Sequence, residues 1–273
     1  MSQIIHGDFR TLLPKLPQGI VDVTITSPRY NFGKNYLGIK DHTSMQEYLA
    51  EMRSLATGLL RVTREDGACF LNVGTRAADP LHDLLVAQEF QRAGWVLQER
   101  IVWQKADEEG NGHFTPINSD HYLNNLWESI FLFSKHGKAT LDRLAIGVPY
   151  KDISNIKRWK SGRAVHCRGD IWFIKYETIK SREHDRQGHE ATFPRELVVR
   201  CLRLIERGRK GLRVLDPCCG IGTVPCVAIE QGHEGVGIDL CAEFANVATK
   251  ALINAIKHFE DSKLVVQVGE LRP

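Results

Sequence analysis

The sequence predicts an α/β fold in which a mostly parallel β-sheet is covered by helices on both faces. Segments rich in β-branched residues alternate with amphipathic helical segments along most of the 273 residues, as in a parallel sheet with crossover helices. One strand segment, residues 127–134, is apolar enough to be buried at the centre of such a sheet. The composition, with 42% hydrophobic and 25% charged residues, is that of an ordinary globular protein.

The first half of the chain opens with a strand and a capped helix. Residues 20–26 (IVDVTIT) alternate and are β-branched, which predicts a strand. Residues 44–62 carry apolar side chains at the helical period, and Ser44 and Glu47 form a capping-box pattern at the start. The further predicted elements are a strand at 67–73, a helix at 79–92, strands at 96–103 and 127–134, and a polar loop at 106–125.

The second half continues the alternation after one irregular insertion. Residues 135–168 show neither a helical nor a strand period. The elements predicted after them are a helix at 193–207, a strand at 212–216, a helix ending near 231, a strand at 234–239, a helix at 242–258 and a last strand at 263–268. The chain thus divides into a first half at 1–134, the insertion at 135–168 and a second half of the same domain at 169–273.

Cysteine usage and hydropathy exclude several classes of protein. The seven cysteines are odd in number and form no C-x-x-C pair, so we expect free thiols in a reducing cytoplasm, without a disulfide framework or a metal site. No apolar run reaches membrane-spanning length, and the start MSQIIHGDFR lacks a signal-peptide core, so no membrane partner is expected. The net charge of +3 does not by itself indicate a nucleic-acid partner.

A glycine-containing turn between a predicted strand and helix, Asp216 to Thr223, is a candidate cofactor site. Gly220 and Gly222 let the backbone approach a ligand, and the start of the helix offers free N–H groups to an anion such as a carboxylate. Asp239 ends the next strand, where an acid can hold ribose hydroxyls. A dinucleotide would favour a third glycine where Pro225 stands, which weakens a nicotinamide-dependent oxidoreductase relative to a protein that binds S-adenosylmethionine (SAM).

A second turn, Ser27-Pro28-Arg29-Tyr30, follows the first predicted strand. Pro28 favours an extended Ser27, which presents the hydroxyl and the neighbouring carbonyls as hydrogen-bond acceptors, and Tyr30 offers an aromatic face. Such acceptors suit an exocyclic amine, because they can favour a pyramidal nitrogen and direct its lone pair at an electrophilic methyl group. Taken alone, so short a pattern is better explained by an ordinary Ser-Pro turn with a half-buried tyrosine.

Together the two turns resemble the β class of amino-group DNA methyltransferases, which carry (S/D)-P-P-(Y/F) first, a target-recognition region next and D-P-F-x-G-x-G-T last. The resemblance spans nearly the whole chain. The smaller matches are Gly7-Asp8, Trp103-Gln104-Lys105, Asp170-Ile171-Trp172 and His189-Glu190-Ala191-Thr192-Phe193-Pro194. Three residues depart from the pattern: Arg29 replaces the second proline, Cys218 replaces an aromatic residue and Glu190 replaces a proline.

The resemblance implies a Rossmann-like SAM-dependent methyltransferase fold with a small recognition insertion at 135–168, between a catalytic half at 1–134 and a SAM-binding half at 169–273. The cofactor it implies is SAM. The catalytic residues it implies are Ser27, Pro28 and Tyr30. The residues implied to bind SAM are Asp8, Phe193, Asp216, Gly220, Gly222, Thr223 and Asp239. No motif offers a cysteine nucleophile, so we expect direct methyl transfer.

The insertion is strongly basic, and its place in the chain is where the family keeps its target-recognition region. We expect double-stranded DNA as the partner, with base flipping as in this class of enzyme. The expected DNA-binding residues are Arg29, Lys157, Arg158, Lys160 and Arg163. By analogy with the family, a homodimer and a cognate restriction endonuclease are expected as further partners.

The target atom is predicted from the first residue of the second turn. Ser27 is more frequent in the cytosine-N4 enzymes of the family, and an aspartate there is more frequent in the adenine-N6 enzymes. Cytosine N4 is therefore the prediction, with adenine N6 as the alternative. The remaining alternatives are a methyltransferase acting on RNA, a DNA-binding relative disabled by Arg29, and the nicotinamide-dependent oxidoreductase.

Overall fold

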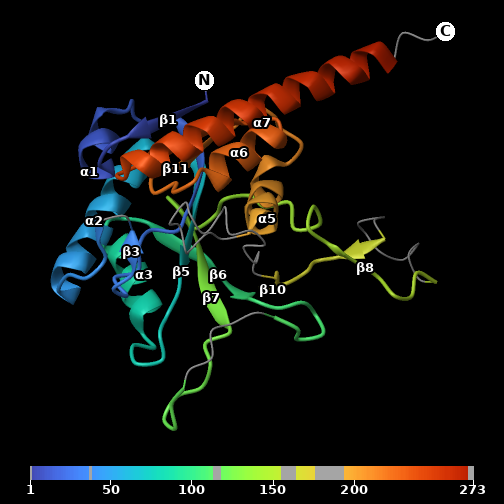
Figure 1. The fold of residues 1–273 in the computed structure, drawn as a ribbon. Coiled ribbons are helices and arrows are strands. Elements are labelled where there is room, and N and C mark those ends of the chain that lie inside the picture. Colours follow the sequence, from blue (N-terminus) through green and yellow to red (C-terminus); the bar gives the residue numbers. More distant parts are fainter. Residues whose placement is uncertain (1, 37–38, 113–117, 155–163, 176–193, 270–273) are drawn as a thin grey trace.

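The computed structural model describes residues 2–36, 39–112, 118–154, 164–175 and 194–269 (Figure 1). An eight-stranded sheet forms its centre, with the strand order β1-β12-β11-β2-β5-β7-β6-β10. All neighbouring strands are parallel except that β7 is antiparallel to both β5 and β6. The strands are β1 (Gln3–His6), β2 (Val21–Thr26), β5 (Thr63–Val73), β6 (Val96–Gln104), β7 (Trp127–Ser134), β10 (Ile171–Phe173), β11 (Arg213–Asp216) and β12 (Glu234–Asp239).

Helices cover both faces of this sheet, which confirms the predicted fold class. The helices are α1 (Phe9–Leu12), the 3-10 helix η1 (Leu13–Lys15), α2 (Met45–Val62), α3 (His82–Arg92), α5 (Arg195–Glu206), α6 (Thr223–Glu230) and α7 (Ala242–Gly269). Two short hairpins, β3 (Asn35–Tyr36) with β4 (Ile39–Lys40) and β8 (Val148–Pro149) with β9 (Val165–His166), lie outside the sheet. The capping box predicted for α2 is present, because Ser44 and Glu47 exchange both hydrogen bonds.

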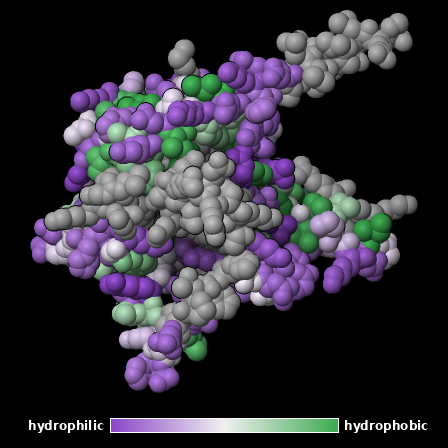
Figure 2. Space-filling view, in the orientation of Figure 1, coloured by the Kyte–Doolittle hydropathy of each residue, from purple (hydrophilic) through white to green (hydrophobic). Residues whose placement is uncertain are grey.

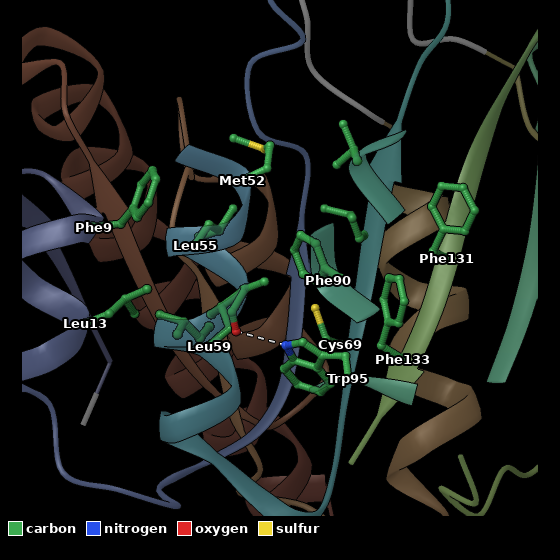
Figure 3. Packing of buried hydrophobic residues seen from close by; sticks show 14 of the residues in the cluster. Phe9, Leu13, Met52, Leu55, Leu59, Cys69, Phe90, Trp95, Phe131 and Phe133 are labelled. Atoms are coloured by element: carbon green, nitrogen blue, oxygen red, sulfur yellow. Dashed lines mark hydrogen bonds between the residues drawn. The ribbon is translucent and has the colours of Figure 1, made fainter. Parts of the chain in front are cut away.

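Each face of the sheet has its own hydrophobic core. On one face α2 and α3 pack against β5 and β7, and the indole of Trp95 anchors this cluster by donating to the Ala56 carbonyl at 2.9 Å (Figure 3). On the other face α5 and α6 pack against alternate residues of β2, β5 and β7. The strand alternation read from the sequence therefore produces two buried faces, with Phe70 of β5 facing one core and its neighbour Leu71 the other.

α6 approaches the sheet very closely at one point. A Cβ atom on Gly235 of β12 would lie 2.3 Å from the carbonyl oxygen of Pro225 in α6. In dinucleotide-binding folds the third glycine of the turn permits such close helix–strand packing. Here the glycine lies on the strand instead of the helix, so a proline is accommodated at the helix position.

One predicted element is wrong: residues 263–268 are not a strand, because α7 continues to Gly269. The segment from 259 to 262 contains neither glycine nor proline, so the helix is not interrupted before the β-branched run. The place that an added strand would take beside β12 is occupied by β1, a strand that sequence reasoning missed. In Figure 1 the C-terminal part of α7 extends beyond the sheet.

The surface shows the expected polar character of a globular α/β protein. On the face shown in Figure 2, apolar residues form small patches separated by polar ones. Within the described ranges, no helix combines the length and the hydropathy needed to cross a membrane.

Candidate active site

Four adjacent parallel strands, β1, β12, β11 and β2, bring the candidate residues to one edge of the sheet. Asp239 and Asp216 end β12 and β11, Ser27 follows β2, and Asp8 follows β1 after one glycine. Parallel strands place their carboxyl ends at the same edge, where α/β proteins bind ligands. The turn from Asp216 to Thr223, here called the cofactor turn, and the turn from Ser27 to Tyr30, here called the reactive turn, lie beside each other. They are linked by Thr26 Oγ1, which precedes the reactive turn and donates to Asp216 Oδ1 at 2.7 Å.

The cofactor turn is held in shape by two buried carboxylates. Asp239 accepts from the Gly220 N–H at 2.7 Å and from the Cys241 N–H at 2.8 Å, and Asp216 accepts from the Cys218 N–H at 3.0 Å. Gly220 and Gly222 have φ values of 51° and 89°, which side chains rarely adopt. Gly222 is the N-cap of α6, and Thr223 is its first residue.

This set of groups fits SAM. The cofactor carries a sulfonium, an ammonium and a carboxylate, so it needs both anionic groups and an N–H-rich helix start. Asp216 and Asp239 would supply the carboxylates, and α6 begins just after the turn that they hold. The Cys219 side chain of the turn packs closely on β12, since a Cβ atom on Gly237 would lie 2.7 Å from the Cys219 sulfur.

We expect the affinity for SAM to rise with pH up to about pH 7. Burial raises the pKa of Asp216 to about 7, and the neighbouring Asp239 contributes in the same direction. SAM has a net positive charge, so it favours the ionised carboxylate, and linkage limits the gain to about tenfold per pH unit below that pKa. Calorimetry from about pH 5.5 to about pH 7 would measure this change.

The matched control for this pH dependence is Asp216→Asn, which should show a flat affinity over the same range. In the protein without cofactor, the free energy of unfolding should fall as the pH rises over this range. Because the folded pKa lies above the ordinary value of 3.8, the ionisation of Asp216 opposes folding, and stability falls as pH rises from there to about 7. An Asp216→Asn protein that kept the wild-type pH dependence of SAM binding would contradict this assignment.

Two further residues are expected at the SAM site, Asp8 and Phe193, and the structure describes only Asp8. Asp8 caps α1 and binds Arg10 through the backbone N–H at 2.8 Å and through the guanidinium, which together lower the pKa of its carboxyl group. Asp8 is therefore an ionised group beside the C-terminal ends of the parallel strands. Phe193 lies outside the described residues, and its neighbour Pro194 precedes α5 as the N-cap.

The reactive turn forms a hydrogen-bonded cluster with two residues that sequence reasoning missed. The hydroxyls of Ser27 and Tyr30 lie 2.7 Å apart, and the Tyr30 hydroxyl has two acceptors within reach, Glu128 Oε2 at 3.0 Å and Asn72 Oδ1 at 3.2 Å. A Cβ atom on Gly74 would lie 2.9 Å from the Tyr30 ring, so this glycine leaves room for it. The signal available in the sequence was an asparagine within the apolar end of β5 and a glutamate near the start of β7.

Arg29, which stands where the family has its second proline, has a structural partner. Its guanidinium pairs with Glu51 of α2, and its carbonyl accepts from the Tyr48 hydroxyl at 3.0 Å. The next bend is held by Asp41, which accepts from the backbone N–H of Asn31 at 2.8 Å. These contacts anchor the turn to α2, so the turn is held without the second proline, and the expected contact of Arg29 with DNA would compete with its ion pair.

The other residues predicted to bind DNA belong to the insertion. Lys157, Arg158, Lys160 and Arg163 lie outside the described residues, between the strands of the β8–β9 hairpin.

The cysteines are not reactive groups of this site. All seven carry free thiols, and burial raises the pKa of both Cys218 and Cys219, so neither is a reactive thiolate. In the described part of the chain no cluster of His, Cys, Asp or Glu is arranged to hold a metal ion.

Comparison with known proteins identifies the family. The model of a family described as DNA methylase, with N6 and N4 specificity, matches residues 21–250. The Type II methyltransferase M.ScaI of Streptomyces caespitosus is 28% identical over 264 residues, which cover 91% of this chain and 80% of that protein. The DNA adenine methyltransferase YhdJ of Escherichia coli K12 is 24% identical over 269 residues, which cover 96% and 85%.

Solved structures agree with the fold. TTHA0409 of Thermus thermophilus, a candidate DNA modification methylase complexed with SAM, matches with a TM-score of 0.63 and 22% identity over 94% of this chain and 95% of its own. The cytosine-N4-specific PvuII DNA methyltransferase matches with a TM-score of 0.68 and 14% identity over 94% and 91%. The chain therefore belongs to the DNA methylase family of amino-group methyltransferases, whose cofactor is SAM.

Proposed function

We propose that this protein methylates the N4 amino group of cytosine within a specific sequence of double-stranded DNA. The observation that carries the proposal is the direct contact between the two turns, in which Thr26 at the end of β2 donates to Asp216 at the start of the cofactor turn. This contact brings the Ser27 and Tyr30 hydroxyls beside the cofactor residues. SAM, when bound, supplies the electrophilic methyl group.

The roles of the chain's own residues follow from their chemistry. The Ser27 hydroxyl and the Pro28 carbonyl accept hydrogen bonds from the target amine and orient its lone pair. The Tyr30 ring stacks on the flipped base. Asp8, Asp239, Asp216 and the backbone of the turn hold the cofactor, together with Gly220, Gly222, Thr223 and Phe193.

Cytosine N4 is preferred because Ser27 supplies a neutral hydroxyl where an aspartate would supply a carboxylate. Among the proteins of the same fold, the PvuII enzyme is described as cytosine-N4-specific, and YhdJ among the relatives as an adenine methyltransferase. Adenine N6 is the second candidate, since both amines present two hydrogens and a delocalised lone pair to the same acceptors.

Identification of the methylated nucleoside tests the target atom. Purified protein and SAM are incubated with unmodified duplex DNA, and separately with RNA, and the products are digested and analysed by mass spectrometry. We expect N4-methylcytosine from DNA only. N6-methyladenine as the product would contradict cytosine as the target base but leave the amino-methyl transfer intact. 5-Methylcytosine would contradict both the N4 target atom and amino-methyl transfer. A methylated product from RNA alone would contradict DNA as the substrate.

We further propose that the basic insertion at 135–168 reads the DNA. Replacing Lys157, Arg158 and Lys160 together with glutamine should weaken DNA binding and reduce its logarithmic salt slope by about 0.9 for each phosphate that is no longer neutralised. Fluorescence anisotropy over a range of salt concentrations measures both quantities.

A matched triple variant controls for the loss of positive charge alone. The matched residues are Arg207, Arg209 and Lys210, which precede the N-terminal end of β11. They therefore lie at the opposite end of the strands from the candidate site. Their replacement by glutamine should leave the salt slope close to that of the wild type. Equal slopes for the insertion variant and the wild type would show that the insertion does not contact phosphates.

Two partners complete the proposal. Relatives such as M.ScaI are named Type II methyltransferases, so we propose a cognate restriction endonuclease whose cleavage is blocked by the methylation. We also propose a homodimer, by analogy with the family. Sedimentation of the purified protein tests the dimer, and protection of methylated DNA in a host expressing the endonuclease tests the pairing.

A further inference from the structure

A continuous line of polar groups leads from the reactive turn into the sheet. The Ser27 and Tyr30 hydroxyls lie 2.7 Å apart, Tyr30 donates to Glu128 Oε2 at 3.0 Å, and Glu128 Oε1 pairs with Lys105 Nζ at 2.6 Å. Glu128 is only 9% exposed and Asn72, the second acceptor of Tyr30, is 3% exposed. Burial of a carboxylate is costly, and Lys105 compensates its charge.

The proposed reaction requires such a line because the amine must lose a proton. When the N–C bond forms at the base nitrogen, the C–S bond of SAM breaks and its electron pair stays on sulfur. The nitrogen is then left with one proton too many. A serine hydroxyl can accept a proton only if it passes its own proton onward, because it is a weak base by itself.

We propose that Glu128 is the proton acceptor for methyl transfer, reached from the target amine through the hydroxyls of Ser27 and Tyr30. The amine proton moves to Ser27 Oγ, the Ser27 proton moves to Tyr30 Oη, and the Tyr30 proton moves to Glu128 Oε2. The N–H electron pair returns to nitrogen, and the carboxylate becomes a carboxylic acid that later loses its proton to water. The proposal rests on the amino-methyl transfer proposed above.

The hydrogen-bond directions support this path. Tyr30 has one hydroxyl proton, and Glu128 Oε2 at 3.0 Å is a nearer acceptor for it than Asn72 Oδ1 at 3.2 Å. When Tyr30 donates to Glu128, its oxygen can accept from the Ser27 hydroxyl, and either hydroxyl of that pair can be the donor. Gly74 keeps the path short, because a Cβ atom there would lie 2.9 Å from the Tyr30 ring and 3.2 Å from Glu128 Oε1. The ring of Tyr30 can stack on the base while its hydroxyl passes the proton.

The decisive variant is Glu128→Gln. The glutamine oxygen can still accept from Tyr30, so a residue that only positions Tyr30 would tolerate the change. A proton acceptor would not, and we expect the single-turnover rate to fall by about 100-fold or more. The solvent isotope effect on that rate should be present in the wild type and reduced in the variant. Glu65→Gln, at an exposed surface pair with Lys135, is the matched control and should behave like the wild type.

Two further measurements separate proton transfer from structure. Formate added to Glu128→Ala should restore part of the rate, whereas Tyr30→Phe should not respond, because it lacks the connecting hydroxyl. In the protein without cofactor, proton NMR should show a Tyr30 hydroxyl resonance that is absent from Tyr30→Phe and shifted in Glu128→Gln. Calorimetric SAM affinity should stay within about twofold in all three variants.

The outcomes distinguish this proposal from the function on which it rests. If the wild type forms no N-methylated base, the proposed function fails. If the wild type is active and Glu128→Gln turns over at the same rate, or formate fails to rescue Glu128→Ala, the function stands and the role of Glu128 is overturned.

Discussion

Replacement of Ser27 by alanine is expected to lower kcat by roughly 100-fold to 1,000-fold while leaving the affinity for SAM nearly unchanged, as for the loss of one hydrogen bond that strengthens in the transition state. The Ser27 hydroxyl contacts Tyr30 and, in the proposed reaction, the target amine. Its nearest link to the cofactor turn is indirect, through Thr26 and Asp216. Single-turnover kinetics and calorimetry measure the two quantities separately.

Ser44→Ala is the matched control for that substitution. Ser44 caps α2 and accepts from the Glu47 N–H at 3.2 Å, so its loss should cost about 1 kcal/mol of stability without changing turnover. Full activity in Ser27→Ala would exclude the proposed role. So would a loss of SAM affinity that matches the loss of rate, because that result would place Ser27 in the cofactor site.

Gly235→Ala is expected to cause the largest loss of stability, about 3 kcal/mol, as in severe overpacking of a core. The added Cβ atom would lie 2.3 Å from the Pro225 carbonyl oxygen and 2.6 Å from its Cα atom. Both are backbone atoms of α6, so the helix itself must move away from β12. Because α6 begins at the cofactor turn, SAM affinity should fall together with the unfolding free energy, which denaturant titration measures.

Gly19→Ala provides the comparison for a glycine substitution without a steric clash. Gly19 has a φ of 65° and no atom within 4 Å of an added Cβ, so its replacement costs only backbone strain, about 1–2 kcal/mol. SAM binding should be retained in that variant. If Gly235→Ala were no more destabilising than Gly19→Ala, the close packing of α6 on β12 would not be the constraint described here.

Strong local patterns predicted most of the sheet. The strand at 127–134 and the strand at 234–239 coincide with β7 and β12, and the helix at 44–62 differs from α2 by one residue. β1 was missed because four residues are too few to establish a period. The last strand was wrong because the β-branched run after 263 was judged by propensity, whereas the uninterrupted helix before it decides the outcome.

The positions of the candidate residues could be predicted where a motif carries them and not where the fold carries them. Asp216 and Asp239 end strands, and Ser27 and Tyr30 lie in the turn after β2, as expected in a parallel sheet. Glu128 reaches Tyr30 across 98 positions of sequence, and no local pattern reports such a contact.

Pro225 disfavours a dinucleotide less strongly than the sequence indicates. Gly235 on β12 supplies the close approach that a third glycine would supply on the helix. A proline at the helix position therefore does not by itself prevent tight packing of α6 on the sheet, and a pattern read along one segment does not report the residue that faces it.

The interleaving of both halves in one sheet has a consequence for synthesis of the chain. Thr26 and Asp216, which meet through a hydrogen bond, are 190 positions apart, so roughly 10–40 s of translation separate them at ordinary ribosomal speeds. During that interval one edge of β2 has no partner, and such an edge can pair with other chains. β1 remains without its partner β12 for even longer. The reactive turn is therefore synthesised early and the cofactor turn late, so products of interrupted synthesis contain the first turn and lack the second.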